Sequence, residues 1–190
     1  YEDSERDGKP SERFGFLIED VDDVADRNDL KELEIPRVSY NKLDADETSN
    51  YALFQYLISN LDWSSTSGRD PVECCHNTKL IGEGPGATTV FAIPYDLDSS
   101  GLVDAQYAVP PEKLGVRSVR DRLFRGFCIH NDSLPAAMDR YREKKQDILD
   151  LFNNEELLTS RGRSYSTRFV EGFYKIIDDP DDVQKKLIGK

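Results

Sequence analysis

Residues 78–95 read TKLIGEGPGATTVFAIPY, and this stretch limits what kind of fold the rest of the chain can build. Two short runs rich in apolar and β-branched residues flank a glycine-rich turn at 82–87. Such a pattern is typical of a β-hairpin. The turn lies between two strands, and no Lys-Ser or Lys-Thr follows it. We therefore interpret it as a plain turn and not as a phosphate-binding loop.

The residues upstream of the hairpin predict short elements. The run RFGFLIED at 13–20 carries apolar and aromatic residues in succession, which indicates a buried strand. One or two helical turns are expected at 21–28, with Asp20 or Asp22 as the N-cap and acids in the first turn. A further short strand is expected at 37–40, a segment with β-branched and aromatic residues.

Helices are expected to dominate the remainder of the chain. The clearest early signal places Leu53, Leu57 and Leu61 on one apolar stripe. Together with later segments of similar period, the predicted helices cover 47–61, 116–127, 134–152, 164–177 and 180–188. The expected fold class is therefore α+β and mostly helical, with a small hairpin between helical layers.

We interpret residues 1–190 as a single domain or a fragment of a larger one. Three parts follow from the predicted elements, covering 1–46, 47–101 and 102–190. The chain begins with Tyr1 and not with Met, so we expect it to be part of a longer protein.

Composition narrows the classes of partner. The chain has 37 Asp and Glu against 25 Lys and Arg, which gives a net charge of −12. Such a surface disfavours nucleic acid and acidic membranes and suits divalent cations or ligands that arrive with them. No apolar run approaches the roughly 18 residues of a membrane span, so we expect none.

The three cysteines, Cys74, Cys75 and Cys128, leave several alternatives open. They could be three thiols, or Cys128 could pair with Cys75 or Cys74, with the third thiol left over. A zinc site is disfavoured, because Cys74, Cys75 and His76 are adjacent and this spacing suits a tetrahedral site poorly.

Polar residues gather where the predicted elements end. Asp62 follows the helix at 47–61, Asn77 opens the hairpin, and Asp96 and Asp98 follow its second strand. Acid and amide oxygens at the mouths of one hairpin can converge on a hard cation such as Mg²⁺ or Mn²⁺. An acid that does not bind the metal can accept a proton from an attacking hydroxyl. This layout is typical of phosphoryl transfer of the protein-kinase type.

The segment 57–101 resembles the catalytic region of atypical kinases of the spore-coat CotH and HipA-like type. The resemblance rests on Asn60-Leu61-Asp62, on Asn77, and on Pro94-Tyr95-Asp96-Leu97-Asp98. Upstream, the segment 16–23 is similar to the one that joins the two lobes of CotH-like proteins. The fold implied is a kinase C-lobe, with an inter-lobe strand, a catalytic hairpin and a helical C-terminal half.

The resemblance also implies roles. Asp62 would be the catalytic base, and Asn77 and Asp96 would bind the metal, with Asp98 competing with Asp96. Glu19, or the backbone beside it, would face the adenine of ATP. The cofactors implied are ATP with Mg²⁺ or Mn²⁺, and the acceptor would be a hydroxyl of a protein or a small molecule. The family often acts outside the cytoplasm, so an extracytoplasmic or secreted location is favoured.

The chain also departs from the kinase pattern. Asp62 and Asn77 are much farther apart than in ordinary protein kinases, and no Arg precedes Asp62. No phosphate-binding Lys on a strand is visible upstream, so the N-terminal lobe would lie elsewhere in the parent protein. The alternative function is a catalytically silent, kinase-like interaction domain that keeps its acids for folding.

Four arginines stand close together in this acidic chain, at Arg117, Arg120, Arg122 and Arg125. They could form ion pairs with the abundant acids. They could also form a clamp for an anionic substrate or a phosphorylated segment.

Overall fold

The hairpin forms as predicted in the structure, a computed structural model that describes residues 15–69 and 74–188. Strands β2 (Thr78–Gly82) and β3 (Val90–Pro94) pair antiparallel, with Leu80 opposite Ala92. A two-residue strand, β1 (Lys31–Glu32), pairs with the other edge of β2, so the sheet order is β1-β2-β3. The strand expected at 37–40 is reduced to one bridge between Arg37 and Ser67.

Helices make up much of the rest of the described chain, which confirms the α+β class. The six α-helices are α1 (Val21–Asp26), α2 (Ala45–Ile58), α3 (Leu134–Glu143), α4 (Lys145–Asn154), α5 (Ser160–Ile177) and α6 (Pro180–Val183). Short 3-10 turns lie at Tyr40–Lys42, Glu112–Leu114 and Cys128–His130, and a π turn follows α6 at Gln184–Ile188. The Asp20 side chain caps α1 by accepting a hydrogen bond from the Asp22 amide, as expected for an N-cap.

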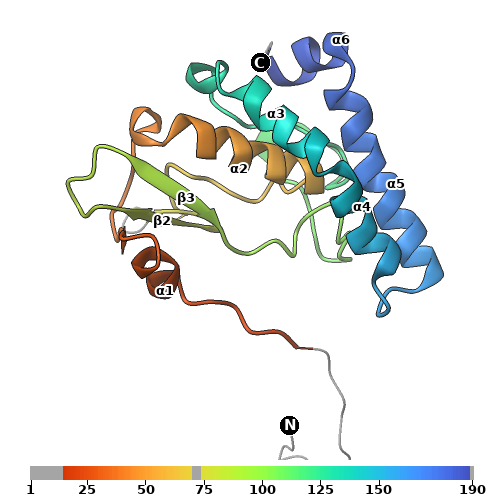
Figure 1. Cartoon of the computed structure of the whole chain (residues 1–190), viewed down its shortest axis with the longest axis horizontal. Helices are drawn as coiled ribbons and strands as arrows, with labels where there is room; N and C mark the ends of the chain where they lie inside the picture. Colours follow the sequence, from red (N-terminus) through yellow and green to blue (C-terminus); the bar gives the residue numbers. More distant parts are fainter. Residues whose placement is uncertain (1–14, 70–73, 189–190) are drawn as a thin grey trace, which may run out of the picture.

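Helix α2 lies in the middle of the fold, with the sheet on one side and the C-terminal helices on the other (Figure 1). Nine of its fourteen residues are buried, so it is covered on most sides and not only along the predicted stripe. Leu53 of α2 and Phe173 of α5 are both fully buried in the larger apolar cluster. A smaller cluster beneath the sheet includes Leu80 and Val90.

Two predicted elements are wrong. Residues 15–20 form no strand, and Phe16 and Leu17 are 76% and 101% exposed, so the apolar run is not buried by the fold. Residues 13 and 14 lie outside the described residues. The helix predicted at 116–127 is an irregular segment with a turn at Ser118, whose amide is bonded to Asp121. In this segment Arg122 and Arg125 bind main-chain carbonyls of α2 and of the loop that follows it, and helical hydrogen bonds do not form.

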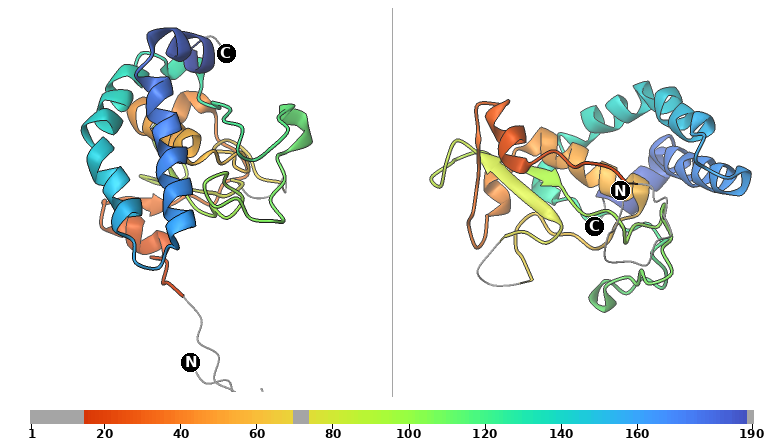
Figure 2. Two further views of the ribbon diagram at one scale, coloured as in Figure 1. Left: turned by 90° about the vertical axis from the view of Figure 1, so that its right-hand side faces the viewer. Right: turned by 90° about the horizontal axis from the view of Figure 1, so that it is seen from below.

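Other helix boundaries shifted less. The segment 134–152 is split at Lys144 into α3 and α4, and the segment 164–177 starts earlier, at Ser160, behind a Thr159 N-cap. The segment 102–115 is irregular, and its 3-10 turn at Glu112–Leu114 projects away from the helical layer (Figure 2). Within the described residues, no helix has the length and apolar character needed to cross a membrane.

Candidate active-site cleft

A cleft of about 680 Å³ opens between the loop that follows α2 and the irregular segment that follows β3. Asp62, Arg69 and His76 lie on one wall. Ser99 and Tyr107 lie on the other. Of the predicted site residues, Asp62 lines the cleft directly. Asn77 contacts Asp62, and the segment that carries Asp96 and Asp98 reaches the cleft through Ser99.

Asp62 is the centre of a hydrogen-bond network in this cleft. Its Oδ1 lies 2.7 Å from Nε2 of His76 and accepts a hydrogen bond from Arg69 at 2.9 Å. The Asn77 side-chain amide donates to the Asp62 main-chain oxygen at 2.7 Å and to its Oδ2 at 3.3 Å. Asp62 and Asn77 are thus brought together across 15 positions of sequence.

Local backbone geometry at the end of α2 positions Asp62. Ser59 adopts the left-handed conformation that ends the helix, with φ of 53°. Asn60 then accepts a hydrogen bond from the Asp62 amide through its side chain, which forms a tight turn. Trp63 donates its ring N–H to the Asn60 carbonyl and is buried at 4% exposure. The loop is therefore fixed on both sides of Asp62.

The network also sets the charge of Asp62. Burial alone would raise the pKa of its carboxyl group, but the hydrogen bonds and positive charge supplied by His76 and Arg69 outweigh burial and lower that pKa below 3.8. The Asp62 carboxylate is therefore ionised at neutral pH. It is suited to accept a hydrogen bond from a hydroxyl group but is a weak base.

The two acids after β3 lie in a second network. Asp98 accepts hydrogen bonds from Tyr107 at 2.8 Å and from Ser99 at 3.1 Å, and the Tyr107 bond lowers the pKa of the Asp98 carboxyl group. Asp96 uses one carboxylate oxygen to accept the Asp98 amide at 3.3 Å. Tyr107 lines the cleft, so the Asp98 network borders the Asp62 network there.

Main-chain hydrogen bonds hold the acid segment against the Asp62 loop. The amide of Tyr95, just before Asp96, donates to the Asn77 carbonyl at 3.2 Å. The amide of Gly101 donates to the Ser59 carbonyl at 3.0 Å. The segment 95–101 is thus bonded at one end beside Asn77 and at the other end three residues before Asp62.

Two arginines of the irregular segment 116–127 complete this architecture. Arg122 donates hydrogen bonds to the carbonyls of Tyr56 and Leu57 at the end of α2 and to that of Phe169. Arg125 donates to the carbonyls of Leu61 and Trp63, on either side of Asp62. Arg122 thus binds carbonyls in the last turn of α2, where intrahelical partners run out, and Arg125 binds carbonyls of the loop that carries Asp62.

Sequence reasoning missed Arg69, Tyr107 and the capping role of Arg122 and Arg125. Arg69 lies in a loop of turn-forming residues, where no periodicity marks a functional side chain. The carbonyls that Arg122 and Arg125 bind are 47 to 66 positions away, so no local pattern could reveal the pairing.

Glu19 lies apart from this cleft. It is on the exposed segment before α1 and forms an ion pair with Arg27 at 3.0 Å. The structure therefore does not bring Glu19 together with Asp62. Within 15–69 and 74–188, no group of three or more His, Cys, Asp or Glu side chains is arranged to hold a metal ion.

Cys74 and Cys75 form a disulfide with each other, directly before His76. This pairing differs from each alternative considered from the sequence. Cys128 is exposed, lies in the 3-10 turn that precedes α3, and takes no part in this bond. The structure therefore has neither the alternative bridge from Cys128 to Cys74 or Cys75 nor three separate thiols.

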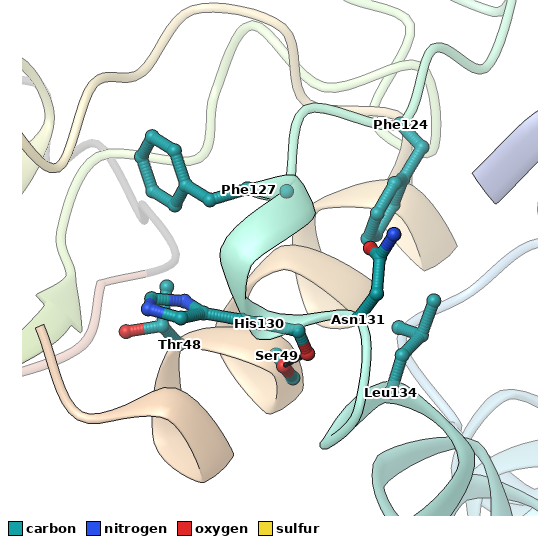
Figure 3. A pocket seen from close by; sticks show the side chains of 8 residues that line it. Thr48, Ser49, Phe124, Phe127, His130, Asn131 and Leu134 are labelled. Carbon is teal, nitrogen blue, oxygen red and sulfur yellow. Dashed lines mark hydrogen bonds between the residues drawn. The ribbon is translucent and has the colours of Figure 1, made fainter. Parts of the chain in front are cut away.

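A second hollow lies between α2 and the turn at Cys128–His130, and it holds about 10 Å³ (Figure 3). Thr48 Oγ1 and His130 Nδ1 are buried there without a hydrogen-bond partner among the described residues. Burial lowers the pKa of His130, so its ring is neutral at pH 7. A hollow of this size fits one water molecule and excludes a substrate.

Searches against protein-family models, curated proteins and solved structures find no match to this chain. The function must therefore be argued from the geometry of the cleft and from the residues that build it.

Proposed function

We propose that the chain is the C-lobe part of a kinase-like enzyme that transfers a phosphoryl group from ATP to a hydroxyl acceptor, with Mg²⁺ or Mn²⁺. One observation carries the proposal. Asn77 donates a hydrogen bond directly to Asp62, the segment with Asp96 and Asp98 is bonded to Asn77 through the Tyr95 amide, and Asp62 and Ser99 line the same cleft.

The proposed role of Asp62 follows from its charge and position. An ionised carboxylate in the cleft wall orients the acceptor hydroxyl by accepting its hydrogen bond. The acceptor oxygen then forms a bond to the terminal phosphorus of ATP, and the bond from that phosphorus to the ADP oxygen breaks. The hydroxyl proton leaves late, towards Asp62, as its lowered pKa requires.

The proposed metal ligands are Asn77 and Asp96. The Asn77 amide nitrogen is used by Asp62, which leaves the amide oxygen available as a ligand. Both carboxylate oxygens of Asp98 accept hydrogen bonds, from Ser99 and Tyr107, whereas one oxygen of Asp96 accepts the Asp98 amide, so Asp96 is the better candidate for the principal ligand. A bound hard cation would neutralise charge on the ATP phosphates.

The alternative is a silent, kinase-like interaction domain, and one observation favours it. The Asp62 carboxylate accepts hydrogen bonds from both Arg69 and His76, so its oxygens are already engaged. In that case the network stabilises the loop after α2 and no acceptor hydroxyl reaches Asp62.

Crystals soaked with Mn²⁺ and a non-hydrolysable ATP analogue test the proposal by anomalous scattering. The proposal expects a Mn²⁺ peak between Asn77 and Asp96 in the wild type. The peak should be lost in Asp96→Asn and kept in Asp132→Asn, which removes an exposed acid elsewhere. No peak at Asn77 and Asp96, with Asp62 still bound to Arg69, would favour the silent domain.

A further inference from the structure

A third hollow, of about 630 Å³, lies on the side of α5 that faces the segment 116–127. Arg120 and Arg122 reach it from that segment, and Arg161 and Arg168 reach it from α5. On α5, Arg161, Ser164, Arg168 and Gly172 recur at helical spacing and therefore share one face. The predicted arginine cluster thus continues on a helix more than thirty residues away.

The charge of this hollow is not neutralised by acids. Among the described residues, no carboxylate lines it, and neither Arg161 nor Arg168 forms an ion pair or a side-chain hydrogen bond. Arg122 is bound to main-chain carbonyls, which do not cancel its charge. Two acids lie nearby: Asp104 is 3.7 Å from Arg120, and Glu171 follows Arg168 by three positions on α5 and lines an adjoining hollow with it. Four arginines and two acids leave a local charge of about +2 in a chain of −12.

The position of Arg161 adds an independent argument. It stands in the first turn of an eighteen-residue helix that has no acid in that turn. The helix dipole makes this end positive and therefore disfavours arginine there. Arg161 goes against this preference, and no acid among the described residues pairs with it. An anion bound between the helix end and the guanidinium groups would explain its position.

We propose that this hollow is a binding site for a small soluble organic phosphate, held by Arg161, Arg168 and Arg120, with Ser164 as a further donor. Guanidinium groups match phosphate oxygens in paired hydrogen bonds, which favours a phosphate ester over a simple carboxylate. The volume exceeds that of a bare phosphate ion, so an organic group has room beside Phe169, whose ring is covered by Arg122 at 4.0 Å. The strongly acidic remainder of the surface disfavours an extended polyanion.

The site is separate from the proposed catalytic cleft, because the residues that line the two hollows do not overlap. The proposal therefore stands whether or not the chain transfers phosphoryl groups.

Titration of ¹⁵N-labelled protein with pyrophosphate and with free phosphoserine, at low ionic strength, tests the proposal. Saturable shifts are expected in amides of 160–172 and 116–122. The double variant Arg161→Gln/Arg168→Gln should weaken binding by about tenfold or more. The control Arg37→Gln/Lys175→Gln removes the same charge from exposed positions elsewhere and should leave affinity within about twofold.

Three results would overturn the proposal. They are no saturable binding at about 10 mM ligand, equal weakening in the control, or shifts centred on His76 and Asp62. A phosphoserine peptide that binds about tenfold more tightly than free phosphoserine would replace the small ligand with a protein partner. Both replaced arginines are exposed, so the fold should survive, and the pair Arg161→Lys/Arg168→Lys provides a milder test with the charge retained.

Discussion

The substitution Arg122→Ala should destabilise the fold more than an alanine substitution at the other partly exposed arginines. The reason is that the Arg122 guanidinium group binds three carbonyls from two helices. The bonds run to Tyr56, Leu57 and Phe169 at 3.0, 3.1 and 2.6 Å, and the group also lies 4.0 Å from the Phe169 ring centroid. Burial lowers the pKa of Arg122 to about 10, so it remains charged at pH 7.

The magnitude follows from these contacts. Each hydrogen bond to a charged donor contributes about 1.5–3 kcal/mol. The three contributions do not add in full, because one guanidinium group makes all three bonds and water can reach part of the site after truncation. The cation–π contact adds about 0.5–2 kcal/mol. We expect a loss of about 3–4 kcal/mol in the free energy of unfolding, and a fall in Tm of roughly 6–16 °C for a chain of this size.

Urea unfolding followed by circular dichroism provides the measurement. The control Arg117→Ala removes an exposed arginine with no side-chain bond among the described residues, and it should change stability by less than about 0.5 kcal/mol. Arg122→Lys keeps a charge but loses the planar fork, so about 1–2 kcal/mol is expected. A loss below about 1 kcal/mol in Arg122→Ala would refute the argument that these carbonyls depend on the guanidinium group.

Three further predictions concern the core and the cleft. Gly101→Ala places a Cβ against the backbone of Val119 and should cost about 1–3 kcal/mol in thermal or urea unfolding, while Gly86→Ala, which meets open space, serves as the control; equal effects would contradict the steric reason. Phe173→Ala empties a fully buried site and should cost about 3–5 kcal/mol, and a loss under about 1 kcal/mol would show that the core collapses around it. Because the folded state lowers the pKa of Asp62, its stabilisation is complete above the unfolded value of 3.8 and is lost as pH falls through the folded pKa. Wild type should therefore exceed Asp62→Asn in stability at about pH 7 but not at about pH 2, and a gap independent of pH would argue against an ionised Asp62 in the network.

The sequence predicts those elements whose signals are local. The hairpin follows from its turn and β-branched strands, and α1 follows from its Asp20 cap. The neighbourhood of Asp62 and Asn77 could also be expected, since one follows a helix and the other opens the hairpin beside it. In each case the residues that carry the signal are within a few positions of the element that they determine.

The errors arise where distant contacts decide. The segment 116–127 has enough long side chains to suggest a helix, but Arg122 and Arg125 gain more by binding carbonyls of the α2 end and the Asp62 loop. The disulfide between Cys74 and Cys75 could not be chosen from spacing alone. Arg69 reaches Asp62 by folding back across its own loop, a path that no periodic pattern encodes.

The two main-chain bonds at Tyr95 and Gly101 limit how far the acids between them can travel. Successive Cα atoms are about 3.8 Å apart, so the Asp98 backbone stays within about 11 Å of each anchor in any conformation of the loop. Asp96, adjacent to one anchor, is held closer still. Any closure around a bound cation must therefore proceed by side-chain rotation and small crankshaft motions of this short tether. Inserting even a few residues between Tyr95 and Gly101 would remove that limit, although every residue of the site would still be present.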